Sequence, residues 1–126
     1  MIEAGSICIS VTPFFNTATG KNEFKKRPVL VLGAADFDDF NVLPISRVTN
    51  SRNLDPSYDI QVDSSIYPNL KLNATISYVR THKQTVVHRS TLNEISNMKV
   101  EYPDLFTGIL DKLEEYNTNL ITDARI

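Results

Sequence analysis

The chain has 126 residues, of which 41% are hydrophobic and 22% are charged, and its formal net charge is −2 at pH 7. These proportions are ordinary for a globular protein and the length suits one core, so we expect a single domain over residues 1–126. A net negative charge excludes a uniformly basic nucleic-acid binder, although it leaves room for a local basic patch.

Six apolar runs rich in Val, Ile and Thr predict β-strands. In chain order they cover residues 5–11, 27–33, 40–48, 58–62, 72–79 and 83–88. Between the first two, residues 12–26 contain proline, glycine and two asparagines and predict a long, polar, mobile loop. Pro28 is expected at the start of the second strand, because it lacks the N–H that an interior ladder position needs.

The pattern changes after the last of these strands. Residues 91–96 predict a short helix capped by Ser90, and residues 104–117 place apolar side chains at helical spacing behind a cap at Asp104. Five to seven short strands followed by a terminal helix predict a mainly β fold, a small and partly open barrel.

Cysteine and histidine usage limits the chemistry. Cys8 is the only cysteine, which excludes an internal disulfide, and one cysteine with two histidines argues against a dedicated zinc site. In its predicted strand, Cys8 is either a buried structural thiol or a nucleophile. The chain has no apolar run of 18 residues and does not start with a basic segment followed by a long apolar one. We therefore expect a cytoplasmic protein with no membrane partner.

Positive charge is concentrated in two segments, residues 21–27 and 71–90. The second holds four Lys and Arg, both histidines and no carboxylate over twenty residues, whereas residues 91–126 hold three basic and seven acidic residues. Such a segment predicts an anion-binding surface, although exposed strands can show the same composition by chance.

Arg27 and Ser46 are the best candidates for a phosphate site. Arg27 follows Lys25 and Lys26 where the predicted loop enters a buried strand, and a guanidinium on rigid backbone suits forked hydrogen bonding to phosphate. Ser46 lies at the predicted end of the next strand, where its hydroxyl can bond a phosphoryl oxygen. The plainer alternatives are that Arg27 pairs with a carboxylate at the strand end and that Ser46 is a polar strand-end residue without a function. No nucleotide-loop, zinc-protease or hydrolase motif occurs.

The order of these segments resembles the MazF/PemK family of toxins from bacterial toxin–antitoxin pairs. The residues that carry the likeness are Gly5-Ser6-Ile7, Arg27-Pro28-Val29-Leu30-Val31-Leu32, Phe40-Asn41, Leu43-Pro44-Ile45-Ser46, and Ser77-Tyr78-Val79 with Gln84. The likeness extends over roughly residues 5–115.

The resemblance implies a homodimeric, SH3-like or CcdB/Kid-type barrel that cleaves single-stranded RNA without metal or other cofactor. The 2′-OH would attack the adjacent phosphate and leave a 2′,3′-cyclic phosphate and a free 5′-OH. By motif, Arg27 is the catalytic arginine, Ser46 contacts the reacting phosphate, and Glu23 is the candidate base or loop latch. From the residues alone, Glu23 and His82 both stay open as the base.

RNA binding is expected to rest on backbone charge and unstacked bases. The residues assigned to it are Lys25, Lys26, Arg47, Arg80, His82, Lys83 and Gln84. Phe14 and Phe15 are expected either to stack on bases or to anchor the loop. Two departures from the family pattern are Lys83, where an aspartate is frequent, and Glu23, which precedes Arg27 by four residues instead of the usual five.

The implied partner is an antitoxin protein whose acidic tail would occupy the same basic groove. The predicted loop over residues 12–26 would close over RNA and be displaced by that tail. The alternative is a non-catalytic, CcdB-like toxin or binding module that acts on a protein target, because a fold does not fix a function.

Overall fold

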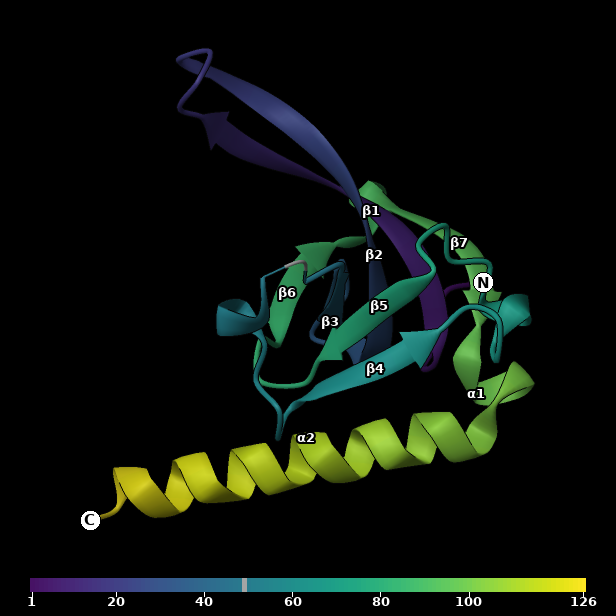
Figure 1. Ribbon diagram of the computed structural model, residues 1–126, viewed down its shortest axis with the longest axis vertical. Coiled ribbons are helices and arrows are strands. Elements are labelled where there is room, and N and C mark those ends of the chain that lie inside the picture. Colours follow the sequence, from purple (N-terminus) through teal and green to yellow (C-terminus); the bar gives the residue numbers. More distant parts are fainter. Residues whose placement is uncertain (49) are drawn as a thin grey trace.

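The computed structural model describes residues 1–48 and 50–126, and for Thr12 the backbone only. Within these residues the chain forms seven strands and a long C-terminal helix (Figure 1). The strands are β1 (Ser6–Asn16), β2 (Lys21–Ala34), β3 (Asp39–Ser46), β4 (Asp59–Asp63), β5 (Ile76–Arg80), β6 (Thr85–His88) and β7 (Leu92–Asn97). The helices are α1 (Met98–Glu101) and α2 (Pro103–Ala124). The prediction of a mainly β fold with a C-terminal helix is confirmed.

All strand pairs are antiparallel, and the sheet follows the order β4-β5-β3-β2-β1-β7. The remaining strand, β6, pairs with the first half of β3, while β5 pairs with its end at Ile45 and Ser46. β5 and β6 therefore run one after the other along the same edge of β3. The sheet curls strongly and stays open, so that it forms a half-barrel (Figure 1).

Both faces of the central strands are buried, which explains why their sequences are continuous apolar runs instead of alternating ones. On one face Ile7, Leu30 and Leu43 join a core that Phe106 and Ile109 of α2 help to close. On the other face lies a smaller core, made of Cys8, Val29, Val31, Val42 and Leu92. Full burial of one such aliphatic side chain stabilises the fold by roughly 1.5–3 kcal/mol.

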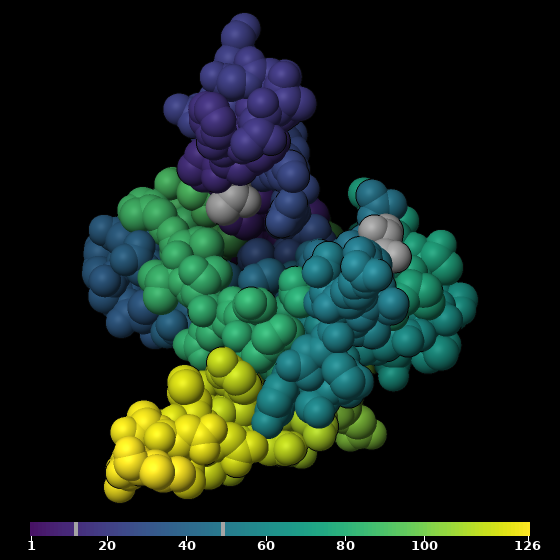
Figure 2. All heavy atoms as spheres, turned by 60° about the vertical axis from the view of Figure 1, so that its left-hand side comes forward, coloured from purple at the N-terminus to yellow at the C-terminus, as the bar shows by residue number. Residues whose placement is uncertain are grey.

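β1 and β2 form a long hairpin whose outer half leaves the sheet. Their pairing runs from Ile7 opposite Leu30 to Asn16 opposite Lys21, but β7 accompanies β1 only as far as Ser10, and β3 accompanies β2 only from Val29. Residues 11–26, which we call the arm, are therefore a two-stranded ribbon that projects from the body (Figures 1 and 2). α2 lies at the opposite end of the molecule (Figure 2).

The prediction of a loop over residues 12–26 is therefore wrong. An exposed ribbon has no buried face, so its sequence lacks the alternation that identifies a strand. Gly20, at φ +69°, makes the turn possible, and its N–H donates to the carbonyl of Asn16 at 2.8 Å. Pro28 lies inside β2 and not at its first residue, at a position where β3 does not pair with the strand.

The predicted short helix over residues 91–96 is also wrong, since these residues belong almost entirely to β7. The helix-like spacing arises because Leu92 packs in the smaller core and Ile95 against the larger one, on opposite faces of the sheet. α2 begins at Pro103 with no side-chain cap, so Asp104 is a first-turn residue and not the predicted cap. There its charge complements the helix dipole. Among the described residues, no helix is long and apolar enough to cross a bilayer.

Candidate functional site

A groove of about 760 Å³ opens where β2 and β3 separate. The first half of β2 belongs to the arm, and the end of β3 turns to pair with β5. The two strands are therefore apart before Val29 on β2 and after Pro44 on β3. Its apolar lining comes from Ile9, Pro28, Ile45, Leu72 and Ile95. Its cationic lining comes from Lys25, Lys26, Arg27, Arg47 and Lys71.

The strand register brings Arg27 and Ser46 to the same place. The β2–β3 ladder ends with Val29 opposite Pro44, and each of the two residues lies two positions beyond that last pair. If the ladder continued, Arg27 would face Ser46. Instead Ser46 pairs with Tyr78 on β5, and both Arg27 and Ser46 line the groove that forms between the parting strands. A guanidinium and a hydroxyl are thus available to one bound anion.

The electrostatics of the groove favour a polyanion. Five cationic side chains line it, and none of the described lining residues is a carboxylate or a histidine. Lys71 adopts the left-handed conformation, with φ 61°, which is uncommon for a residue with a side chain. Mutual repulsion of these cations would be relieved by phosphates. Within residues 1–48 and 50–126, no cluster of three or more His, Cys, Asp or Glu could hold a metal ion.

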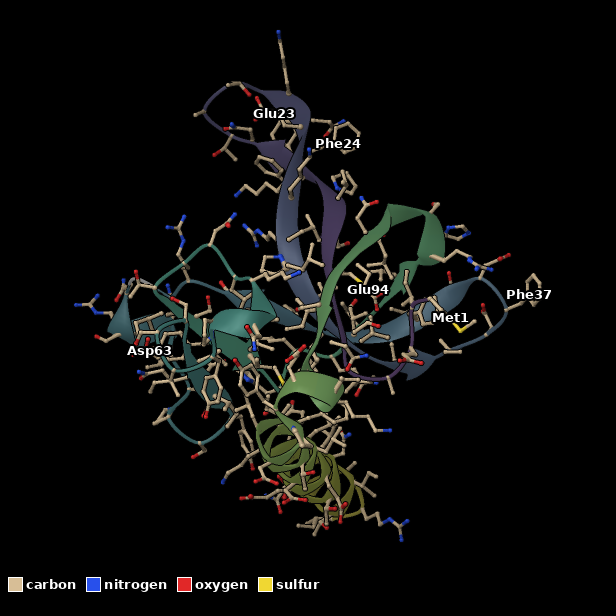
Figure 3. The ribbon with its side chains drawn as sticks, turned by 90° about the vertical axis from the view of Figure 1, so that its right-hand side faces the viewer. Met1, Glu23, Phe24, Phe37, Asp63 and Glu94 are labelled. Carbon is tan, nitrogen blue, oxygen red and sulfur yellow. The ribbon has the colours of Figure 1, made fainter. Side chains whose placement is uncertain are left out.

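Glu23 does not reach the groove within one chain. Its carboxylate accepts hydrogen bonds from Asn16 Nδ2 at 3.0 Å and from Thr19 Oγ1 at 3.2 Å. It lies near the tip of the arm (Figure 3). Four residues of extended strand separate it from Arg27, a span of roughly 13 Å. These contacts are those of a latch that holds the turn, so the structure separates Glu23 from the two other predicted catalytic residues.

The predicted RNA-binding residues divide into two groups. Lys25, Lys26 and Arg47 line the groove, whereas Arg80, His82, Lys83 and Gln84 are not among its lining residues. Residues 81–84 connect β5 to β6, and the Gln84 amide donates to Asn41 Oδ1 on β3 at 3.2 Å. They lie along β3 toward its middle, while the groove is at its end.

Arg80 and His82 contact Asp59 instead of facing the groove. Arg80 Nε donates to Asp59 Oδ1 at 3.0 Å, and the Asp59 side chain is fully buried. His82 is only 12% exposed, and its ring packs beside the rings of Tyr58 and Tyr116, which contact each other. Its Nδ1 is 3.7 Å from Asp59 Oδ1, beyond hydrogen-bond length. Both side chains are therefore part of the packing between β4, β5 and α2.

Cys8 is fully buried in the smaller core. Burial raises the pKa of its thiol to about 11, with a smaller contribution from the carboxylate of Glu94. The thiol is therefore protonated at neutral pH and shielded from solvent, which favours the structural alternative over the nucleophile.

Sequence reasoning missed the part of the groove that comes from residues 71–74, which line it opposite the base of the arm. The available signal was the segment without carboxylates that starts at Lys71. Its position could not be inferred, because it depends on the turn of residues 68–70 (η2, Pro68–Leu70), which ends in the left-handed Lys71. Comparison with models of known protein families gives no match, and no curated protein matches the chain either.

Proposed function

We propose that this protein is an endoribonuclease that binds single-stranded RNA in the groove and cleaves it next to Arg27 and Ser46. The observation that carries the proposal is that both side chains line one cationic groove, at the point where two strands part, and that none of its described lining residues is a carboxylate. A phosphodiester needs both a counter-charge and a hydrogen-bond donor in its transition state.

The chemistry follows from these groups. The 2′-oxygen forms a bond to the adjacent phosphorus as its proton passes to water, and the bond from phosphorus to the 5′-oxygen breaks as that oxygen takes a proton from water. The products are a 2′,3′-cyclic phosphate and a 5′-OH. Arg27 stabilises the charge that develops on the phosphorane, and the Ser46 hydroxyl donates to a non-bridging oxygen.

The proposal extends to the assembly implied by the likeness to MazF/PemK toxins. We assign the curled half-barrel to the SH3-like or CcdB/Kid-type class, acting as a cytoplasmic homodimer, and its regulator to an antitoxin with an acidic tail. Five cations without a carboxylate among the described lining residues support such a partner, because the tail and RNA would compete for one set of charges.

A second candidate is favoured by one specific observation. The described residues of the groove include neither a carboxylate nor an imidazole, so the groove of one chain supplies no ordinary general base for the 2′-OH. A groove with a cation and a hydroxyl but no base suits a non-catalytic, CcdB-like binding module that captures an acidic protein segment.

Cleavage of a synthetic RNA separates the two candidates. The wild type is incubated with a mixed-sequence RNA and with its 2′-O-methyl counterpart in the presence of a chelator, and the termini are read by mass spectrometry. We expect cyclic phosphate ends from the first substrate only. Arg27→Ala and Ser46→Ala should abolish them, and Arg125→Ala, at the far end of α2, should not. RNA that is left uncut, whether it is bound or not, would contradict the nuclease and leave the non-catalytic module as the candidate.

A further inference from the structure

The arm exposes two phenylalanine rings near its tip. Phe15 on β1 is 60% exposed and Phe24 on β2 is 73% exposed. Figure 3 shows the Phe24 ring standing clear of the ribbon, beside Glu23. Rings at this exposure on a projecting ribbon add little to the core, and their faces are open to a ligand.

Both rings lie on the face of the ribbon that carries Ile9 and Pro28, while Lys25 and Arg27 alternate to the other face and line the groove from there. Ile9 pairs with Pro28, and both line the groove. Side chains alternate along a strand, so Phe24, four residues before Pro28, lies on the same face as Pro28. Phe15, six residues after Ile9, shares that face for the same reason. The rings thus extend the apolar lining of the groove outward along the arm, over roughly 15–20 Å.

The opposite face of the arm is occupied differently. Phe14 is half-buried, and Lys25 Nζ lies 4.3 Å from the centre of its ring. Phe14 therefore stabilises the ribbon through a cation–π contact. Phe14 is therefore engaged inside the ribbon, and the ring of Phe15 is more exposed.

Charge on the arm points to RNA as the occupant. Lys26 lies on the face of the rings, and Lys21 and Lys25 lie on the other face. The one acidic residue of the arm, Glu23, is held by Asn16 and Thr19. Cations that follow a phosphate backbone, interleaved with rings on which bases stack, are the means by which proteins bind single strands without reading their sequence.

Resting on the proposed function, we propose that Phe15 and Phe24 form a stacking platform for unpaired bases of the RNA strand whose phosphates occupy the groove. The arm then determines how many nucleotides beside the scissile phosphate are held, and it requires them to be single-stranded. Phenylalanine has no hydrogen-bonding group, so the platform adds affinity without discriminating strongly among bases.

Binding of an RNA oligomer and of an abasic oligomer with the same number of phosphates tests the platform. Affinities are measured for the wild type, Phe24→Ala, Phe24→Leu, Phe24→Tyr and the double variant F15A/F24A. Phe37→Ala, at an 88% exposed ring in a separate loop, is the matched control (Figure 3). We expect Phe24→Ala to weaken RNA binding roughly 5- to 150-fold while leaving abasic binding unchanged. Tyrosine should restore the loss and leucine should not.

The outcomes distinguish this inference from the proposed nuclease. Wild-type cleavage with unchanged RNA affinity in F15A/F24A overturns the platform and leaves the nuclease standing. An equal loss for both oligomers overturns it as well, because the rings would then not act on bases. A change in oligomeric state of F15A/F24A at unchanged RNA affinity assigns the face to a second copy of the chain instead. A wild type that binds neither oligomer overturns both proposals.

Discussion

Arg80 donates two hydrogen bonds to the carboxylate of Asp59, from Nε to Oδ1 at 3.0 Å and from Nη2 to Oδ2 at 3.4 Å. The same Nη2 also donates to the carbonyl of Asn53 at 2.8 Å. The fork ties β5 to β4 and to the loop before it. Because the Asp59 side chain is fully buried, its charge depends on this partner.

Replacing Arg80 should therefore damage stability more than RNA binding. Arg80→Ala leaves a buried carboxylate without its main counter-charge, and we expect the free energy of unfolding to fall by about 3 kcal/mol. Urea denaturation measures this, and RNA affinity of the folded variant should stay within about threefold of the wild type. Asp59→Asn combined with Arg80→Met should recover part of the stability. A large loss of affinity with unchanged stability would instead place Arg80 in the RNA site.

Arg27→Lys separates charge from geometry in the groove. Lysine keeps the positive charge but cannot offer two parallel N–H groups to a phosphate. We expect RNA affinity to change little and the cleavage rate to fall about 100-fold, the scale of losing one transition-state donor. Single-turnover kinetics with saturating enzyme measure the rate. An unchanged rate would mean that Arg27 acts only as a point charge.

Lys71→Gly tests the charge at the wall of the groove without adding strain. Glycine adopts φ 61° freely, so the free energy of unfolding should change by no more than about 1 kcal/mol. Loss of one phosphate contact should make the slope of log affinity against log salt less negative by about 0.7. Lys71→Ala keeps the backbone strain. It should show the same salt slope as Lys71→Gly and a lower free energy of unfolding than Lys71→Gly. An unchanged slope in both variants would show that Lys71 makes no phosphate contact.

The strands of the body could be predicted because burial leaves a pattern in their sequence. Val29, Val31 and Val42 pack on one face of the sheet while Leu30 and Leu43 pack on the other, which makes the runs continuous and easy to identify. The arm carries no such pattern, since its ribbon has no covered face. Its backbone pairing, reinforced by local side-chain contacts at Glu23 and Phe14, makes it a hairpin.

The candidate site was predictable only where it follows strand ends. Arg27 and Ser46 lie on consecutive strands, each two positions beyond the last pair of the antiparallel ladder, so both line the groove that opens where the strands part. The sequence could not show that Arg80 lies outside the groove, because its partner Asp59 is 21 residues away on another strand. Glu23 and Arg27 are four positions apart, a separation that a loop can close but that an extended ribbon stretches to roughly 13 Å, which is why Glu23 is found outside the groove.

The buried thiol of Cys8 should make stability depend on alkaline pH. Its pKa is raised to about 11 in the folded protein, from 9.0 for an exposed thiol. Between these values the unfolded chain has released the thiol proton while the folded chain retains it, so rising pH favours unfolding. This loss of stability is absent below about pH 9 and grows until about pH 11.

Comparison with Cys8→Ala isolates this effect, because the tyrosines and lysines titrate in both proteins and cancel. At pH 7 the variant should be less stable by roughly 1 kcal/mol, since alanine fills less of the smaller core. As the pH rises from 9 to 11, the stability of the wild type should decline toward that of the variant and can fall below it. Iodoacetamide should label Cys8 at pH 7 only as fast as the protein opens. Parallel stability curves, or rapid labelling of the folded protein, would show that the thiol is accessible and ionises as in water.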